Sequence, residues 1–95
     1  MPFIDIILPA LPMKNYMHNA RSVRDLLGYS QSYVAYELSI SQSLYCKMEN
    51  GQIIPTIDFL EKLCVLFEIG IEDFLKKDRS EIIKLVLSNQ NLKYP

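Results

Sequence analysis

The middle of the chain carries helix-start and helix-stop signals that leave room for two short helices with very little between them. Ser30 and Ser41 are residue types that begin helices, because a serine hydroxyl accepts a hydrogen bond from a free backbone N–H of the first turn. Gly28 and Gly51 tolerate the left-handed backbone that ends a helix. We therefore expect one helix to end at Gly28, a second to begin after Ser30, and a third to begin after Ser41 and end at Gly51.

The second and third helices are expected over residues 31–38 and 42–50, joined by the turn 39–41. Two short helices joined by so short a turn form a helix-turn-helix. Ala35 is small, which suits a close crossing of the two helices, and Ile40 supplies an apolar side chain that the turn can bury. The third helix is expected to turn two apolar side chains inward, Tyr45 and Met48, and to leave its other face free.

Apolar residues at helical spacing predict further helices on both sides of this pair. A first helix is expected over 15–27, a fourth over 57–67 after the cap residue Thr56, and a short fifth over 71–75. The inward face of the fourth helix is expected to consist of Ile57, Leu60, Leu63, Cys64 and Phe67.

The C-terminal part of the chain predicts one more helix. Residues 76–79 read as a polar hinge, and Ser80 is the expected cap of a helix over 81–88. The tail 89–95 is expected to fray. The fold class that follows is all-α, with five helices, an extended N-terminal arm and an extra C-terminal helix.

The expected organisation is an arm over residues 1–14, the helical domain over 15–76, and the C-terminal helix and tail over 77–95. Prolines confine the arm to extended or turn conformations. Its apolar stretch 3–8 is expected either to pack on its own domain as a strap or to be exchanged with a second copy.

Composition bounds the class of protein. Hydrophobic residues make up 49% of the 95 residues, enough for one compact core without bound metal. The stretch 3–8 is too short for a signal sequence or a membrane span, and Cys46 and Cys64 form no disulfide framework. We expect a soluble, cytoplasmic protein.

The formal net charge of −1 is low for a nucleic-acid binder, so DNA binding must depend on where the charges lie.

A set of motifs in register over residues 20–75 resembles the Cro and phage-repressor (XRE-type) family of helix-turn-helix DNA-binding domains. The Glu-Asn-Gly that ends the third helix is the most specific of them. The motifs are Ser30-Gln31, Ala35 and Leu38, Ser41-Gln42-Ser43, Met48-Glu49-Asn50-Gly51, Pro55, Leu60 and Leu63, and Ile71 to Leu75. The resemblance implies a lambda-repressor-like bundle that binds a double-stranded DNA operator in the major groove with helix 42–50, usually as a symmetric dimer.

The resemblance gives the base-reading role to Gln42, Ser43 and Lys47. Glutamine can pair with adenine and lysine can donate to guanine, so these residue types suit the edges of bases. The resemblance also implies that Arg24 and Glu49 form an ion pair that fixes the first helix to the third.

Four further residues are candidate phosphate contacts. The resemblance places Gln31 against phosphate at the start of the second helix and Asn50 against phosphate at the end of the third. Tyr33 can donate to phosphate from near a helix start, and Arg21 supplies a positive charge on the first helix.

Several positions depart from the family pattern. Ser39 replaces the usual turn glycine, so the turn must adopt a costlier backbone or be assisted by the serine hydroxyl. Gln52 and Ile53 stand where basic residues are common. Tyr29, Tyr33 and Tyr36 form an unusual aromatic group. An exposed Tyr36, with Ile53 and Ile54, is expected to be either an ordinary surface feature or part of a protein-contact patch.

An enzyme is not expected, since His18 lies outside any catalytic motif, Cys46 has no neighbouring cysteine, and the three glycines form no phosphate-binding loop. No cofactor or metal is expected either. The predicted function is that of a sequence-specific DNA-binding regulator of transcription, specifically a repressor. It is expected to act as a homodimer whose interface consists of residues 3–8, 71–75 and 82–87. The alternative is a protein-interaction module, an antitoxin-like protein or an adaptor, that contacts a partner through the arm, Tyr36 or the last helix.

Overall fold

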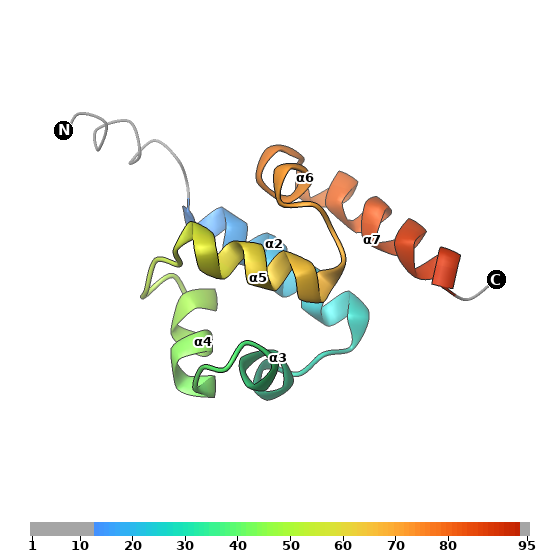
Figure 1. The fold of residues 1–95 in the computed structure, drawn as a ribbon. Coiled ribbons are helices and arrows are strands. Elements are labelled where there is room, and N and C mark those ends of the chain that lie inside the picture. The colour runs from blue at the N-terminus through green and yellow to red at the C-terminus, as the bar shows by residue number, and fades with distance from the viewer. Residues whose placement is uncertain (1–12, 94–95) are drawn as a thin grey trace, which may run out of the picture.

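The computed structural model describes residues 13–93, and all regular structure within that range is helical. The helices are α2 (Met13–Leu27), α3 (Gln31–Glu37), α4 (Gln42–Glu49), α5 (Ile57–Phe67), α6 (Ile71–Lys76) and α7 (Arg79–Lys93). In Figure 1, α3 and α4 form one end of the molecule, α2 and α5 cross its middle, and α6 and α7 lie on the opposite side. The all-α class, with five helices followed by one more, is confirmed. Residues 1–12, which hold most of the expected arm, lie outside the described residues.

The helix starts in the middle of the chain are where the sequence predicts them. The side-chain oxygens of Ser30, Ser41 and Thr56 each accept the backbone N–H three residues further on, at 3.0 Å. Such caps replace a hydrogen bond that the first turn lacks and contribute about 1 kcal/mol each. Gly28 and Gly51 have φ values of 76° and 79°, the left-handed backbone expected after a helix end.

The turn between α3 and α4 uses the costlier backbone. Ser39 has a φ of 61°, in the left-handed region that a side chain disfavours by about 1–2 kcal/mol. This conformation lets the chain reverse within three residues and turns Ile40 toward the core. The short turn holds α3 and α4 in the helix-turn-helix arrangement.

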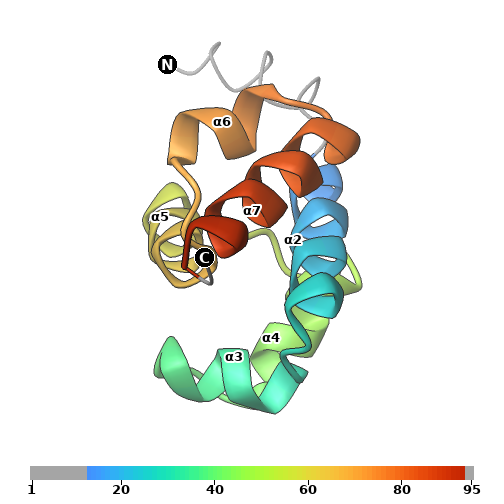
Figure 2. The ribbon, with the colours of Figure 1, turned by 90° about the vertical axis from the view of Figure 1, so that its right-hand side faces the viewer.

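The core joins all six described helices. Its buried members include Met17, Ala20 and Val23 of α2, Val34 and Ala35 of α3, Tyr45 and Met48 of α4, Leu60, Leu63 and Phe67 of α5, Phe74 of α6, and Ile82 and Val86 of α7. Ala35 is 2% exposed, as expected for a close helix crossing. Figure 2 shows α7 lying along α2, so the C-terminal helix is part of the same packed body.

The inward face expected for α5 is wrong at its first position. Ile57 is 52% exposed, and Phe59 is buried. At about 100° per residue, Ile57 falls about 60° outside the arc defined by Leu60, Leu63 and Phe67, and it lies in the first turn of α5.

The C-terminal region also differs from the prediction. The cap of α7 is Asp78, whose carboxylate accepts the backbone N–H of Glu81 at 3.0 Å, and not Ser80. A carboxylate suits the positive end of a helix better than a hydroxyl does, so the helix begins earlier and the polar hinge shrinks to two residues. The tail does not fray at 89, because α7 continues to Lys93 and the Asn89 amide donates to the Glu68 carbonyl at the end of α5, at 2.6 Å.

Candidate nucleic-acid interface

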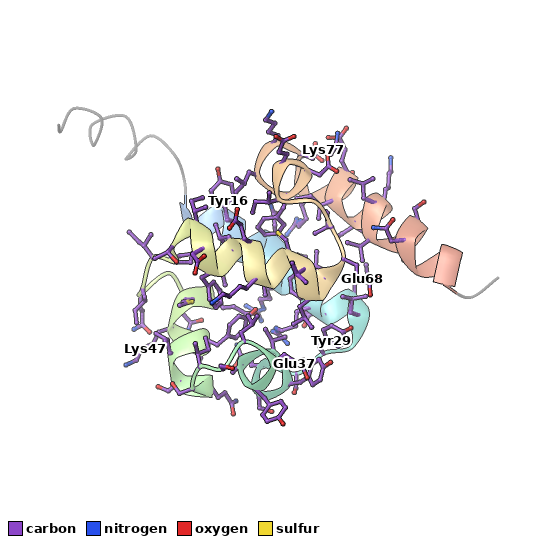
Figure 3. All side chains as sticks on the ribbon, in the orientation of Figure 1. Tyr16, Tyr29, Glu37, Lys47, Glu68 and Lys77 are labelled. Atoms are coloured by element: carbon purple, nitrogen blue, oxygen red, sulfur yellow. The ribbon has the colours of Figure 1, made fainter. Side chains whose placement is uncertain are left out.

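Helix α4 has one buried face and one exposed polar face. Tyr45, Met48 and Glu49 are buried. Positions 42, 43, 46, 47 and 50 fall within about 140° of arc on the opposite side, and all of them except the partly buried Cys46 are exposed. We call Gln42, Ser43, Lys47 and Asn50 the reading strip. Figure 3 shows Lys47 extending away from the body of the protein.

A buried ion pair holds α4 against α2. The Arg24 guanidinium donates to Glu49 through Nε, 2.8 Å from Oε2, and through Nη2, 3.1 Å from Oε1. Arg24 is 8% exposed and Glu49 is 6% exposed. Two parallel bonds between planar groups fix orientation as well as distance. The structure thus brings together the two charged residues that the family resemblance pairs.

The same carboxylate also holds α3. The Gln31 side-chain amide donates from Nε2 to Oε1 of Glu49 at 2.9 Å, and a third nitrogen of Arg24, Nη1, donates to the Tyr29 carbonyl at 2.9 Å. Glu49 therefore connects three helices, and Arg24 in addition fixes the loop between α2 and α3. The bond from Gln31 to Glu49 was not predicted from the sequence, because neither spacing nor residue type indicates a contact between residues 18 positions apart.

The charges in this cluster stabilise one another. Burial by itself would raise the pKa of Glu49, but the neighbouring side chains outweigh burial and lower this pKa below its usual value: Arg24 first, through its hydrogen bonds and charge, then the nearby Tyr45 hydroxyl and the Gln31 amide. The hydrogen bond to Glu49 raises the pKa of Arg24 against the effect of burial. Glu49 is thus a carboxylate held in its charged form inside the fold.

Tyr45 lies beside this cluster with its ring fully buried. Its hydroxyl lies near the Glu49 carboxylate but forms no hydrogen bond of good geometry among the described residues, and its pKa is raised first by burial and then by that neighbouring carboxylate. A buried hydroxyl without a partner is destabilising relative to an apolar group of the same shape.

The candidate phosphate contacts surround α3 and α4. Gln31 is half-buried, with one amide hydrogen on Glu49 and a second available. Tyr33 is 39% exposed and its ring packs against Tyr29, with centroids 4.8 Å apart. Asn50 is exposed at the end of α4, and Arg21 is exposed on α2, about one helical turn before Arg24.

The structure explains one of the departures from the family pattern, Ile53, and shows two others, Gln52 and Tyr36, to be exposed. Ile53 packs against the core, so it serves stability at a position where a basic residue is common. Gln52 is exposed beside Gly51. Among the residues that the structure describes, Tyr36 and Ile54 are 79% and 71% exposed.

Other kinds of site are not evident in the part of the chain that the structure describes. Within residues 16–89, whose side chains are placed, no cluster of acidic, histidine and cysteine side chains is suited to a metal ion. Burial raises the pKa of the Cys64 thiol to about 12, which makes this cysteine a poor nucleophile. None of the described helices is long and apolar enough to cross a membrane.

Comparison with known proteins agrees with this geometry. Residues 21–74, more than half of the chain, match the family model described as helix-turn-helix. The matched segment runs from α2 to α6 and so contains the ion pair, the turn and the reading strip. No curated protein and no solved structure matches the chain.

Proposed function

The chain belongs to the Cro-type (XRE-like) helix-turn-helix family of DNA-binding regulators, and we propose that it is a repressor that recognises one operator sequence by inserting α4 into the major groove. The observation that carries the proposal is the reading strip. It is a row of exposed polar side chains on the face of α4 opposite its buried residues, on a helix fixed by the Arg24–Glu49 pair.

The base contacts are assigned to Gln42, Ser43 and Lys47. Gln42 lies at the first position of α4, where its amide can donate to and accept from one adenine edge. Lys47 can donate to guanine acceptors, and the Ser43 hydroxyl can serve either base type. A helix enters the major groove by its N-terminal residues in this kind of motif, which suits a strip that begins at the start of α4.

The phosphate contacts are assigned to Gln31, Tyr33, Asn50 and Arg21. These side chains donate hydrogen bonds or charge that do not depend on base identity. The Gln31 amide has a special place, since one hydrogen is bonded to Glu49 and the second is available to a phosphate oxygen. One amide group would then bond both a DNA phosphate and Glu49, the carboxylate of the ion pair that positions α4.

We further propose a homodimer, because ten cationic residues per chain provide few phosphate contacts and two copies double them. The proposed interface includes residues 71–75 and 82–87. Leu87 is 44% exposed, and Ile71, Leu75, Ile83 and Leu85 are only partly buried. A two-fold dimer would place the two α4 helices about 34 Å apart, one turn of DNA. Residues 3–8, the third predicted part of the interface, lie outside the described residues.

The division between base and phosphate contacts is tested by three matched substitutions. Gln42→Ala should cost about 1–3 kcal/mol on the preferred operator and relax the choice at one base pair. Gln31→Ala should weaken binding to all duplexes by similar factors. Gln90→Ala, the same change within α7, should leave binding unchanged, because α7 lies on the side of the molecule away from α4 (Figure 1). Equal losses on every duplex for Gln42→Ala and Gln31→Ala would contradict the proposed roles.

A further inference from the structure

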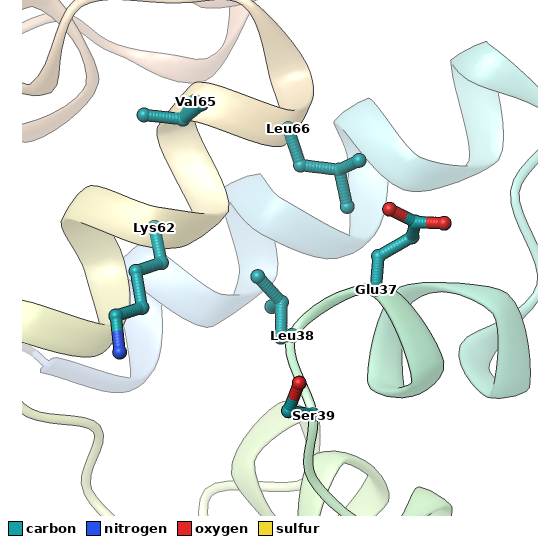
Figure 4. A pocket seen from close by; sticks show the side chains of 6 residues that line it. All are labelled: Glu37, Leu38, Ser39, Lys62, Val65 and Leu66. Atoms are coloured by element: carbon teal, nitrogen blue, oxygen red, sulfur yellow. The ribbon is translucent and has the colours of Figure 1, made fainter.

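A shallow groove lies between the α3–α4 turn and the outer side of α5. Its volume is about 430 Å³, and it is open to solvent. Leu38, Val65 and Leu66 supply its apolar surface, while Glu37 and Lys62 stand on opposite sides of it (Figure 4). None of its lining residues belongs to the reading strip or to the residues 71–75 and 82–87.

Val65 is the feature of this groove that the fold does not explain. It is 78% exposed, although most apolar residues of α5 face the core. Leu66 and Leu38 beside it are only partly buried. An exposed aliphatic side chain beside an apolar groove, with a charged residue on each side, is typical of a protein-contact surface.

We propose that this groove is a weak self-association site, in which a second copy of the chain docks about a two-fold axis. In a two-fold contact, if one residue touches another on the partner, the reverse contact forms as well. Glu37 of each copy would then meet Lys62 of the other, so the contact makes two opposite-charge pairs. Val65 of each copy would enter the apolar groove of the other over Leu38 and Leu66.

The charges around the groove allow this arrangement. Lys62 already lies 3.7 Å from Asp58 on its own helix, but both side chains are more than 60% exposed, so that pair contributes little. Lys62 can therefore exchange partners at small cost. Glu61, the other charged residue of α5, is exposed but does not line the groove.

The groove is too small for a stable dimer in free solution. A stable interface covers about 800 Å² on each partner and about 20–30 residues, whereas this groove has only six lining residues. Such a contact becomes effective when two copies are held side by side and the local concentration reaches about the millimolar range. If the proposed function is right, neighbouring operator sites on DNA supply that proximity, and binding to adjacent sites becomes cooperative.

The contact itself is tested without DNA, by sedimentation equilibrium of the full chain from micromolar to millimolar concentration. The groove contact should appear as the association step that occurs only at the highest concentrations. Glu37→Lys alone and Lys62→Glu alone should each abolish this step, because each creates two like-charge pairs. An equimolar mixture of the two variants should restore it, since every pair across the interface is then of opposite charge. Val65→Glu should also abolish the step, and Glu61→Lys, a reversal on the same helix outside the groove, should not. A step that the single reversals leave unchanged, or that the mixture fails to restore, overturns the proposal, as does the absence of any such step in the wild type.

The consequence on DNA is measured with duplexes that carry one site or two adjacent sites. Binding to the second site should be about tenfold tighter than to the first, and Val65→Glu should remove this factor while leaving single-site affinity unchanged. Independent binding to the two sites by the wild type would overturn the cooperative role. Failure to bind any single site would contradict the proposed function instead, and the sedimentation result would still decide the groove contact.

Discussion

Replacing Arg24 by methionine is expected to destabilise the protein severely. Methionine fills a similar volume but donates nothing, so Glu49, 6% exposed, would lose both its 2.8 Å and its 3.1 Å hydrogen bond and keep only the one from Gln31. Leaving one member of a buried ion pair without its partner costs about 3–5 kcal/mol. Domains of this size have total stabilities of about 5–15 kcal/mol, so the melting temperature should fall by at least about 12 °C.

The paired change Arg24→Met with Glu49→Leu separates this cause from loss of packing. With both charges gone, the variant should recover most of the lost stability, since a well-packed apolar pair can replace a buried ion pair at little cost. Arg21→Met, an exposed change on the same helix, should shift stability by less than about 0.5 kcal/mol. Urea unfolding followed by far-ultraviolet circular dichroism measures all three. If the single variant were as stable as the wild type, or the double variant no more stable than the single one, the unpaired Glu49 carboxylate would not be the cause of the loss.

The Glu49 cluster and the turn before α4 allow three further tests. Because folding lowers the pKa of Glu49, the ionised carboxylate stabilises the folded state above its unfolded pKa of 4.5, and this stabilisation is lost as the pH falls through the lower folded pKa. The free energy of unfolding should therefore begin to fall below about pH 4.5, and it should fall less steeply in the double variant, which lacks Glu49. Tyr45→Phe should be neutral or slightly stabilising in thermal unfolding, because it removes a buried hydroxyl without a partner; a loss above about 1.5 kcal/mol would show that the hydroxyl is bonded. Ser39→Gly should stabilise the protein by about 1 kcal/mol, since glycine adopts a φ of 61° without strain, and an unchanged urea midpoint would contradict this.

The parts of the fold that the sequence predicted correctly depend on local chemistry. Ser30, Ser41 and Thr56 cap helices through bonds to residues only three positions away, so their role can be read from nearby residues. The whole span of α5 was predicted because a cap, a continuous apolar pattern and a following break all agree. The order of helices follows from such local signals.

The parts that were wrong or missed depend on contacts between distant segments. The length of α7 is one case, since the Asn89 amide donates to the carbonyl of Glu68, the residue that follows α5. The bond from Gln31 to Glu49 is another, because it exists only once α3 and α4 have been brought together by the turn. Ser80 and Asp78 are both good cap residues, and nothing in the local pattern decided between them.

Whether α4 reads an operator is decided by selecting bound sequences from a randomised duplex library with the full chain. If α4 reads bases, one palindromic sequence should be enriched, with half-sites about one helical turn apart, and Gln42→Ala should relax the choice at one base pair in each half-site. Folded protein that enriches no sequence over the starting library would contradict the claim that α4 reads an operator.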